Sequence, residues 1–423
     1  MPSLTRLSAC WIIKNEATFL PHSLASVEGL ADELIIGDTG STDESVEIAR
    51  HFGAHVVSIP WKGSYAEARN TVLGHVTGSW VLVLDGDEAL ELSHREVVKH
   101  LVDETYKGGA WPPESGQRRS DAYYLDRRHY VRDVSLSNLL PLADPFPPLD
   151  LGAIGYFSTH DVRLFRARPE YRYEGALHES LEGSLWAHGV TIARASPVIH
   201  HYGPCKPRDE SREKALRYVM LARTKSDAAP NDWKAKFELA VELKRCGEIC
   251  DAFELLRGAI EQFPEQWEIH LEFGVMLVEQ SAWESGVTVL RRVIEARPHL
   301  VRGWYALGVA FLALDDLETA SACFDQCQQL SPDEGASLVM GGVMLLLRGE
   351  IEQAEGRFSR IRKIFPRLAH GEVGSRLCRV LSGEELFVAS GLEQEVVTAM
   401  GGERLWKMVV ERGGVERGAP TNS

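Results

Sequence analysis

The first ninety residues alternate between short apolar runs and segments whose apolar positions follow helical spacing. The apolar runs are LSACWII, ELIIGD, HVVSIP and WVLVLD, and helical segments such as ESVEIARHF lie between them. This alternation is typical of a parallel sheet covered by helices on both faces. Further strand-like pieces follow as AYYLDRRHYV, HDVRLFRA, YRYEGALHE and GVTIARASPVIHHYG. We therefore predict an α/β domain over residues 1–205.

The second half of the chain repeats with a period of 34 residues. Prolines recur at that spacing, and small residues recur at two other fixed positions of each period. This pattern resembles tetratricopeptide repeats, in which two antiparallel helices approach closely at small residues and a proline ends the second helix. The positions are Pro230, Pro264, Pro298, Pro332 and Pro366, then Ala240, Gly274, Gly308 and Gly342, and finally Ala252, Gly286, Ala320 and Ala354.

These two patterns set the expected organisation. The helical segment 206–232 reads as a half repeat that connects the α/β domain to four full repeats over residues 233–368. Residues 369–410 are expected to form capping helices, because a solenoid needs its last apolar face covered. The tail 411–423 is expected to be disordered. Residues 107–120 and 138–157 are rich in Gly, Pro and Ser and read as mobile loops.

Composition narrows the functional classes. The chain has 423 residues and a formal net charge of −15, which argues against a nucleic-acid or anionic-membrane binder. No apolar run approaches the roughly 18–20 residues of a membrane span, and the N-terminus does not read as a signal peptide. Seven cysteines, an odd number, suggest reduced thiols. We therefore expect a cytoplasmic enzyme or binding protein.

Candidate chemistry gathers where the predicted strands end. Ligands of parallel α/β sheets bind at the carboxyl ends of the strands, and here those ends carry polar or charged groups. Asp85 and Asp87 flank Gly86, so one turn can direct both carboxylates at one point. Hard oxygen ligands of this kind suit Mg²⁺ or Mn²⁺ bound together with a diphosphate. The alternative is a solvated surface turn.

Several stretches carry a family resemblance. The segments IIKNE, DELIIGDTGSTD, WKGSYAEARN and WVLVLDGDE, in this order and spacing, resemble family 2 glycosyltransferases of the GT-A fold. The later segments DVRLFRA, YEGALHE and VIHHYG resemble a bacterial subgroup in which tetratricopeptide repeats follow the catalytic domain. Peptide glycosyltransferases of the sublancin type are similar to that subgroup. The resemblance implies a GT-A α/β/α domain followed by an α-solenoid.

The resemblance also implies roles for individual residues. Asn15, Glu16, Asp38, Arg69, Asp85 and Gly86 would bind the nucleotide sugar, and Asp85, Asp87 and His178 would hold Mn²⁺ or Mg²⁺. Since no clear Glu-Asp pair follows residue 92, Glu179 is the first candidate for the catalytic base and Asp161 the second. A structural ion pair with Arg163 or Arg166 is the competing interpretation of Glu179. Further candidates are Glu88, His201 and Trp61; Glu88 would face the donor sugar or cap a helix that begins near Ala89.

The implied reaction is an inverting, metal-dependent transfer from a nucleoside-diphosphate sugar, with a UDP-sugar as the expected donor. A peptide or protein acceptor would lie on the repeats, which can also join two copies of the chain. Transfer to a saccharide or a lipid-linked acceptor is the alternative within this class. The rival hypotheses are a repeat scaffold with an inactive transferase domain, and a nucleotidyltransferase, which usually needs a Gly-rich loop where Lys14 to Ala17 stand.

Overall fold

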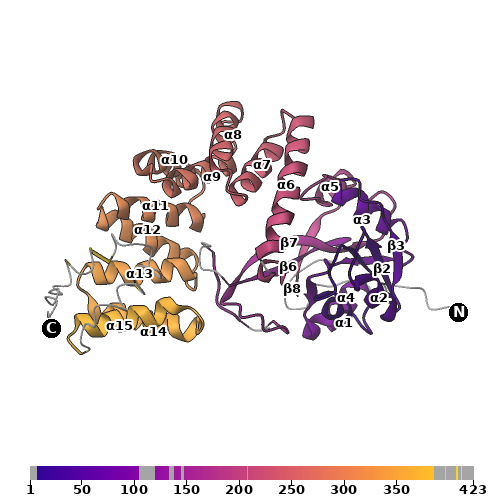
Figure 1. Cartoon of the computed structure of the whole chain (residues 1–423), viewed down its shortest axis with the longest axis horizontal. Coiled ribbons are helices and arrows are strands. Elements are labelled where there is room, and N and C mark those ends of the chain that lie inside the picture. The colour runs from indigo at the N-terminus through magenta and orange to yellow at the C-terminus, as the bar shows by residue number, and fades with distance from the viewer. Residues whose placement is uncertain are drawn as a thin grey trace. The chain divides into compact units, whose positions relative to one another are not determined.

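The computed structural model describes residues 7–103, 120–132, 138–143, 147–206 and 208–384, together with residues 396, 406, 407 and 411. The chain divides into two compact units (Figure 1). The first unit contains residues up to 130 and residues 158–252, and the second contains residues 131–157 and those from 253 onward. Within the described residues, every helix is too short or too polar to cross a lipid bilayer.

The described residues of the α/β part form an eight-stranded sheet in the order β3-β2-β1-β4-β7-β6-β8-β5. Strands β1 to β4 run parallel to their sheet neighbours among themselves, as predicted. Strand β7 is antiparallel to β4, and β5 is antiparallel to β8, so the whole sheet is mixed rather than parallel. The strands are β1 (Leu7–Ile13), β2 (Glu33–Asp38), β3 (His55–Ser58), β4 (Trp80–Val83), β5 (Glu88–Leu90), β6 (Ala122–Val131), β7 (Gly155–Arg166) and β8 (Ile192–His201).

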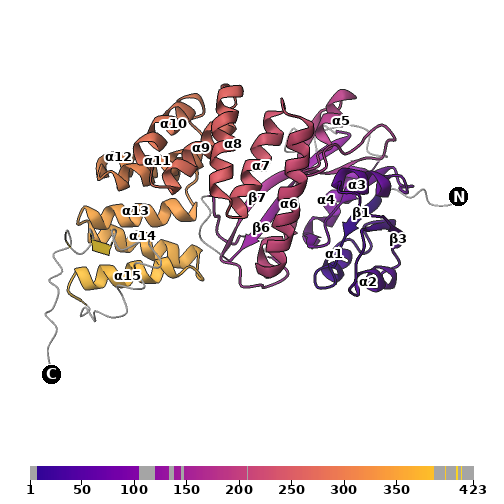
Figure 2. The same ribbon diagram turned by 45° about the horizontal axis from the view of Figure 1, so that its top comes forward.

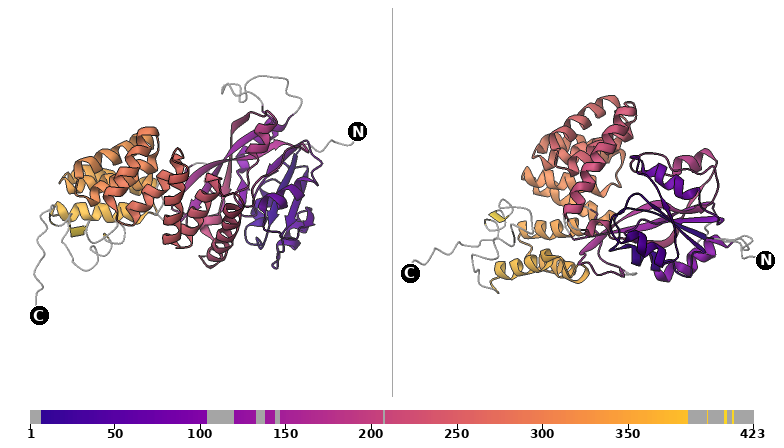
Figure 3. Two further views of the ribbon diagram at one scale, coloured as in Figure 1. Left: turned by 90° about the horizontal axis from the view of Figure 1, so that it is seen from above. Right: turned by 45° about the vertical axis from the view of Figure 1, so that its right-hand side comes forward.

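Helices lie on both faces of the sheet (Figure 3), and alternating side chains of the strands pack into two separate hydrophobic cores. In β1, Leu7, Ala9 and Trp11 pack in one core, while Cys10 packs in the other. This follows from the two-residue period of a strand. The first core is covered by α1 (Leu20–Ala25), α2 (Ser45–His51) and α4 (Arg95–Val102), and the second by α3 (Tyr65–Leu73) and α5 (Glu182–Ala187).

Two longer helices complete the first unit. The expected connecting segment is helix α6 (Arg208–Ala228), which follows the short 3₁₀ turn η2 (Gly203–Cys205). It lies beside α7 (Trp233–Arg245), as Figure 2 shows. The Lys225 Nζ of α6 lies 2.6 Å from the Glu238 Oε2 of α7.

Each predicted 34-residue repeat contains two helices. The first helices of the repeats, α7, α9, α11 and α13, begin at residues 233, 267, 301 and 335. A Cβ at Gly308 would lie 2.7 Å from the Phe324 ring, and one at Gly342 would lie 2.7 Å from the Phe358 ring. The repeated glycines therefore allow the close approach for which the sequence predicted them. The remaining helices are α8 (Ile249–Gln262), α9 (Trp267–Glu279), α10 (Trp283–Ala296), α11 (Val301–Ala313), α12 (Leu317–Leu330), α13 (Gly335–Leu347), α14 (Ile351–Ile364) and α15 (Ala369–Leu381).

The segment 138–157, expected to be a mobile loop, is in part built into the second unit. Leu139 is fully buried, and its carbonyl accepts a hydrogen bond from the Gly335 N–H at 2.7 Å. The Asn138 N–H donates to the Glu334 carboxylate at 2.8 Å. The prediction of a mobile loop was wrong at this position, because the residues that bury Leu139 lie on helices nearly 200 residues later in the chain.

Three other predictions fall largely outside the described residues. Helix α15 begins the region expected to cap the solenoid, but most of residues 385–410 are not described. The expected tail from 412 onward and almost all of the predicted loop 107–120 are likewise outside the described residues.

Candidate active site

The ends of β1 and β2 are joined by the turn that follows β2. Asn15, directly after β1, has a positive φ of 56°, and its side-chain oxygen accepts from the Thr42 N–H at 2.7 Å. The Asp38 carboxylate at the end of β2 accepts from the Ser41 N–H at 2.9 Å. Asn has an unusually low cost in the left-handed region, which allows this geometry. Asn15 and Asp38 therefore belong to one polar edge of the sheet, as the sequence predicted.

Asp85, which follows β4, is surrounded by arginines. Its carboxylate lies 2.6 Å from Arg69, 3.3 Å from Arg163 and 3.9 Å from Arg127. Burial by itself would raise the pKa of Asp85, but the arginines, Arg69 first among them, hold it well below its usual range. Arg69 is itself buried, although it lies on a helix of the sheet's outer layer.

Glu88 lies inside the protein rather than in the expected positions. Residues 88–90 form strand β5, so Glu88 does not cap a helix, and its side chain is fully buried. Its carboxylate accepts from the Asp85 N–H at 2.9 Å and from Arg163 at 3.0 Å. Burial and the charge of Asp85 outweigh the arginines and raise the pKa of Glu88. The buried Glu88 carboxylate therefore binds the backbone of the turn at Asp85.

Asp87 faces a different set of partners. The Lys206 ammonium lies 2.7 Å from Asp87 Oδ2 and also 2.7 Å from Glu16 Oε1. His201 Nε2 lies 3.5 Å from Asp87 Oδ1, whereas its neighbour His200 is buried elsewhere. A Cβ at Gly86 would lie 2.6 Å from the Glu16 side chain, so glycine is what allows the ends of β1 and β4 to meet.

The two candidate bases each form an ion pair with an arginine of the group around Asp85. Glu179 forms an ion pair, as its competing interpretation held, but the partner is Arg69 at 2.6 Å. Asp161 lies 3.2 Å from the Arg127 Nε and accepts from the Thr159 hydroxyl at 2.9 Å. The Asp161 side chain is 40% exposed and that of Glu179 is 13% exposed, so Asp161 is the more open carboxylate.

His178 does not take the place expected for a metal ligand. Its Nε2 lies 3.3 Å from Glu242 of α7, and its ring packs edge-on against Tyr218 of α6. In the part of the chain that the structure describes, no group of three or more His, Cys, Asp or Glu side chains could hold a metal ion. His178 therefore does not join Asp85 and Asp87. The contact with Glu242 orients the His178 side chain, and the local sequence gives no sign of this long-range contact.

The two strand-end acids nevertheless fit a divalent cation in their chemistry. Mg²⁺ is usually held by one or two carboxylates, and substrate phosphates and water supply the other ligands. The ion pairs at these strand ends form two groups, one around Asp85 and one around Asp87, which together contain six carboxylates and four cations and so have a formal charge of −2 with neutral histidines. The carboxylates are Glu16, Asp85, Asp87, Glu88, Asp161 and Glu179, and the cations are Arg69, Arg127, Arg163 and Lys206.

Helix α6 contributes Tyr218 to an aromatic edge, the row of rings formed by Trp61, Tyr65 and Tyr218, which the sequence did not predict. Trp61 packs edge-on against Tyr65 with ring centroids 4.8 Å apart, and Tyr65 packs against Tyr218 at 5.8 Å. Burial raises the pKa of Tyr218, and the nearby charge of Glu179 adds to the rise. Trp61 is 37% exposed, so it is not a core residue. Nothing in the pattern of α6 distinguished Tyr218 from a packing residue.

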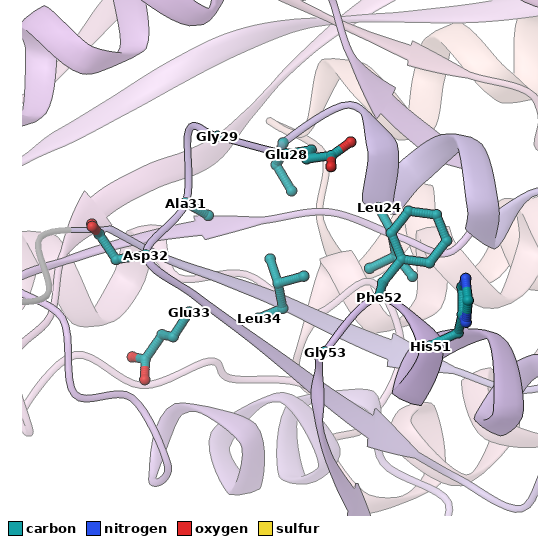
Figure 4. Close-up of a pocket in the computed structure, with 11 residues that line it drawn as sticks. Leu24, Glu28, Gly29, Ala31, Asp32, Glu33, Leu34, His51, Phe52 and Gly53 are labelled. Carbon is teal, nitrogen blue, oxygen red and sulfur yellow. The ribbon is translucent and has the colours of Figure 1, made fainter.

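A cavity of about 480 Å³ lies elsewhere in the first unit, where β2 begins (Figure 4). It is lined by residues such as Leu24, Phe52, Asp32 and Glu33. Two of its three acids accept hydrogen bonds from the backbone: Asp32 from the Leu7 N–H at 2.9 Å and Glu33 from the Thr77 N–H at 2.7 Å. Because this cavity lies at the amino end of β2, it is distinct from the ion pairs at the carboxyl ends.

Comparison with known proteins finds relatives of the N-terminal region. Residues 8–132 match the family model described as glycosyl transferase family 2. An uncharacterized glycosyltransferase of Rickettsia conorii is 37% identical over 23% of this chain and 35% of its own length. The N-terminal region of the chain is therefore similar to family 2 glycosyltransferases, as the sequence motifs suggested.

Two further relatives extend over both parts of the chain. A TPR repeat-containing protein of Synechococcus elongatus is 30% identical over 62% of this chain and 58% of its own length. The prophage-derived glycosyltransferase SunS of Bacillus subtilis is 19% identical over 60% of this chain and 52% of its own length. The chain thus spans between about a third and three fifths of the length of these three relatives.

Proposed function

We propose that the chain, whose N-terminal region is similar to family 2 glycosyltransferases, transfers a sugar from a nucleoside-diphosphate donor to a nucleophilic acceptor with inversion at the anomeric carbon. The observation that carries the proposal is the convergence of Glu16, Asp85 and Asp87 at the carboxyl ends of β1 and β4, with the buried Arg69 and the half-buried Lys206 as their ion-pair partners. In α/β sheets this edge is where nucleotides bind.

Each part of the site has a distinct task in this proposal. Asn15 and Asp38 hold the nucleoside, with a UDP-sugar as the donor that the family favours. Asp85 and Asp87 would hold Mn²⁺ or Mg²⁺, which would offset the negative charge that develops on the departing diphosphate. Arg69 fixes Asp85 and Glu179 relative to each other through two contacts of 2.6 Å.

The acceptor needs a base, and the geometry favours Asp161. A general base must lie within reach of the acceptor proton, so an accessible carboxylate suits the task better than one held by a buried guanidinium. Asp161 removes the acceptor proton as the nucleophilic atom of the acceptor bonds to the anomeric carbon and the bond from that carbon to the diphosphate oxygen breaks, so that the nucleoside diphosphate leaves. Glu179 then acts through Arg69 as a positioning residue.

The acceptor itself is proposed to be a peptide or protein that lies on the tetratricopeptide repeats. Stacked helical repeats form extended concave surfaces suited to peptides. The seven cysteines, all within the described residues, are thiols rather than disulfides, which suits a reducing compartment such as the cytoplasm.

Donor binding can be tested by thermal shift with UDP, GDP, ADP and their sugars, each with and without Mn²⁺. A ligand at 100 times its Kd should stabilise the fold by about 2.7 kcal/mol. Asp85→Asn should abolish the shift, whereas Asp121→Asn, on the surface beside Arg166, should keep it. If no nucleotide shifts the wild-type protein in either condition, the transferase proposal fails and the scaffold hypothesis gains.

The base can be tested with the donor so identified and a peptide library. Asp161→Asn should lower kcat by about 10²- to 10⁴-fold while donor binding is retained, since a base acts on the acceptor side. Glu179→Gln should instead weaken donor binding, because it releases Arg69. The reverse pattern would assign the base to Glu179.

A further inference from the structure

The Lys206 ammonium contacts Asp87, one of the two acids to which the proposed function assigns the metal ion. It lies 2.7 Å from both carboxylate oxygens of Glu16 and 2.7 Å from Asp87 Oδ2, and it sits over the Phe19 ring at 5.5 Å. Its side chain is 13% exposed and that of Asp87 is 5% exposed. Three carboxylate oxygens around one small cation are also the environment that a hard divalent ion prefers.

Lys206 is therefore an internal partner of the acid assigned to the metal. Asp85 forms ion pairs with Arg69 and Arg163, whereas Asp87 contacts Lys206 at 2.7 Å and His201 at 3.5 Å. A divalent ion that binds to Asp87 has to share or replace the ammonium, because two cations close together on one carboxylate repel each other.

Replacing the Lys206 ammonium with a divalent ion at Asp87 would also affect the neighbouring elements, because of where Lys206 lies in the chain. Lys206 follows η2 and stands just before α6, the helix that brings Tyr218 to the aromatic edge. A Cβ at Gly203 would lie 3.0 Å from Asp87 Oδ2 and 2.5 Å from His201 Nε2, so the η2 turn is packed directly against the acid. A shift of Lys206 would therefore be transmitted to the start of α6.

We propose that Lys206 is a tethered counter-ion that competes with the divalent cation for Asp87 until the donor diphosphate arrives. This inference rests on the proposed function. Metal alone has to displace the ammonium from two carboxylates and leave it without a partner. When the diphosphate is present, its oxygens provide the ammonium with a new partner, so the cost of displacement falls.

The proposal predicts that metal and nucleotide bind with positive coupling. By thermodynamic reciprocity, each should increase the affinity for the other by the same factor, which for coupled sites is typically about 5- to 150-fold. Removing the ammonium should raise the affinity for metal alone about tenfold or more and should reduce the coupling by a similar factor.

The experiment measures Mn²⁺ binding by electron paramagnetic resonance and calorimetry, with and without the nucleoside diphosphate selected by thermal shift. Lys206→Met should bind Mn²⁺ alone more tightly than the wild-type protein. Lys206→Arg, whose guanidinium forms a bidentate pair with carboxylates, should bind it no more tightly than wild type. Lys225→Met is the matched control, because Lys225 forms a similar 2.6 Å pair with Glu238 in the same unit.

The outcomes separate this inference from the function on which it rests. If wild type binds Mn²⁺ and nucleotide together but Lys206→Met gains no affinity for Mn²⁺ alone, the counter-ion proposal is overturned and the proposed function stands. If neither wild type nor either Lys206 variant binds nucleotide in the presence of Mn²⁺, the proposed function fails as well. Should Lys206→Met not fold, tighter Mn²⁺ binding by Lys206→Arg than by wild type would overturn the proposal.

Discussion

Replacing Arg69 with methionine removes a guanidinium that two carboxylates share. Arg69 donates to Asp85 and to Glu179, each at 2.6 Å, and its side chain is 9% exposed. Breaking a buried ion pair by removing one partner typically costs about 3–5 kcal/mol. Asp85 retains Arg163 at 3.3 Å, which reduces the loss. We therefore expect Arg69→Met to lower the free energy of unfolding of the first unit by about 2–4 kcal/mol.

Native-state hydrogen exchange is the suitable measurement, because a chain with two compact units need not unfold in a single step. Peptides that cover β1 and β4 report opening of the first unit. A loss of 2–4 kcal/mol corresponds to roughly 30- to 1000-fold faster exchange. The matched control is Arg168→Met, whose pair with Asp121 at 3.2 Å is exposed and should contribute about 0–1 kcal/mol.

A second variant tests the cause of the loss. If an unpaired Glu179 carboxylate accounts for part of the cost, Arg69→Met combined with Glu179→Gln should recover stability relative to Arg69→Met alone. An Arg69→Met effect no larger than that of Arg168→Met would refute the argument that the guanidinium holds the site together.

Two further predictions concern acid stability and repeat packing. Burial would raise the pKa of Glu91, but hydrogen bonds from Ser93 and His200 lower it to about 2, so it contributes stability above about pH 4.5 that is lost as the pH falls towards 2. Glu91→Gln should flatten the Tm profile across that interval, and an unchanged profile would contradict this assignment. Gly342→Ala places a Cβ 2.7 Å from the Phe358 ring and should destabilise the repeats by about 1–3 kcal/mol. At Gly356 on α14 an added Cβ would meet no neighbouring atom, so Gly356→Ala should stabilise the repeats by about 0.5–1 kcal/mol. Urea unfolding of both variants measures these changes. Equal effects of the two substitutions would count against the packing argument.

The features that could be predicted from the sequence are those with a local cause. The 34-residue period placed the repeat helices because each glycine or proline acts within its own helix pair. Asp38 and Asp85 could be assigned to the carboxyl edge because strand alternation shows where each strand ends. These signals involve residues near one another in the chain, so a single sequence displays them.

The features that could not be predicted depend on distant pairings. Glu88 was expected to face the donor sugar or to cap a helix, but it lies on a strand that pairs with β8, where Glu88 is opposite His201. Arg163 lies on β7 and reaches Asp85 because that strand returns antiparallel beside β4. Lys206 is 190 residues from Glu16, and no local pattern links them.

The burial of Leu139 among the helices of the second unit has a consequence for how such proteins can be rearranged. The second unit is assembled from two separate stretches of chain, so a cut after residue 205 or 232 would leave residues 131–157 in one fragment and their helices in the other. Fragments made at those positions should expose Leu139 and aggregate or unfold. A graft that replaced the repeats as one contiguous segment would have to redesign residues 131–157 too, so the exchangeable part of this protein is discontinuous in its gene.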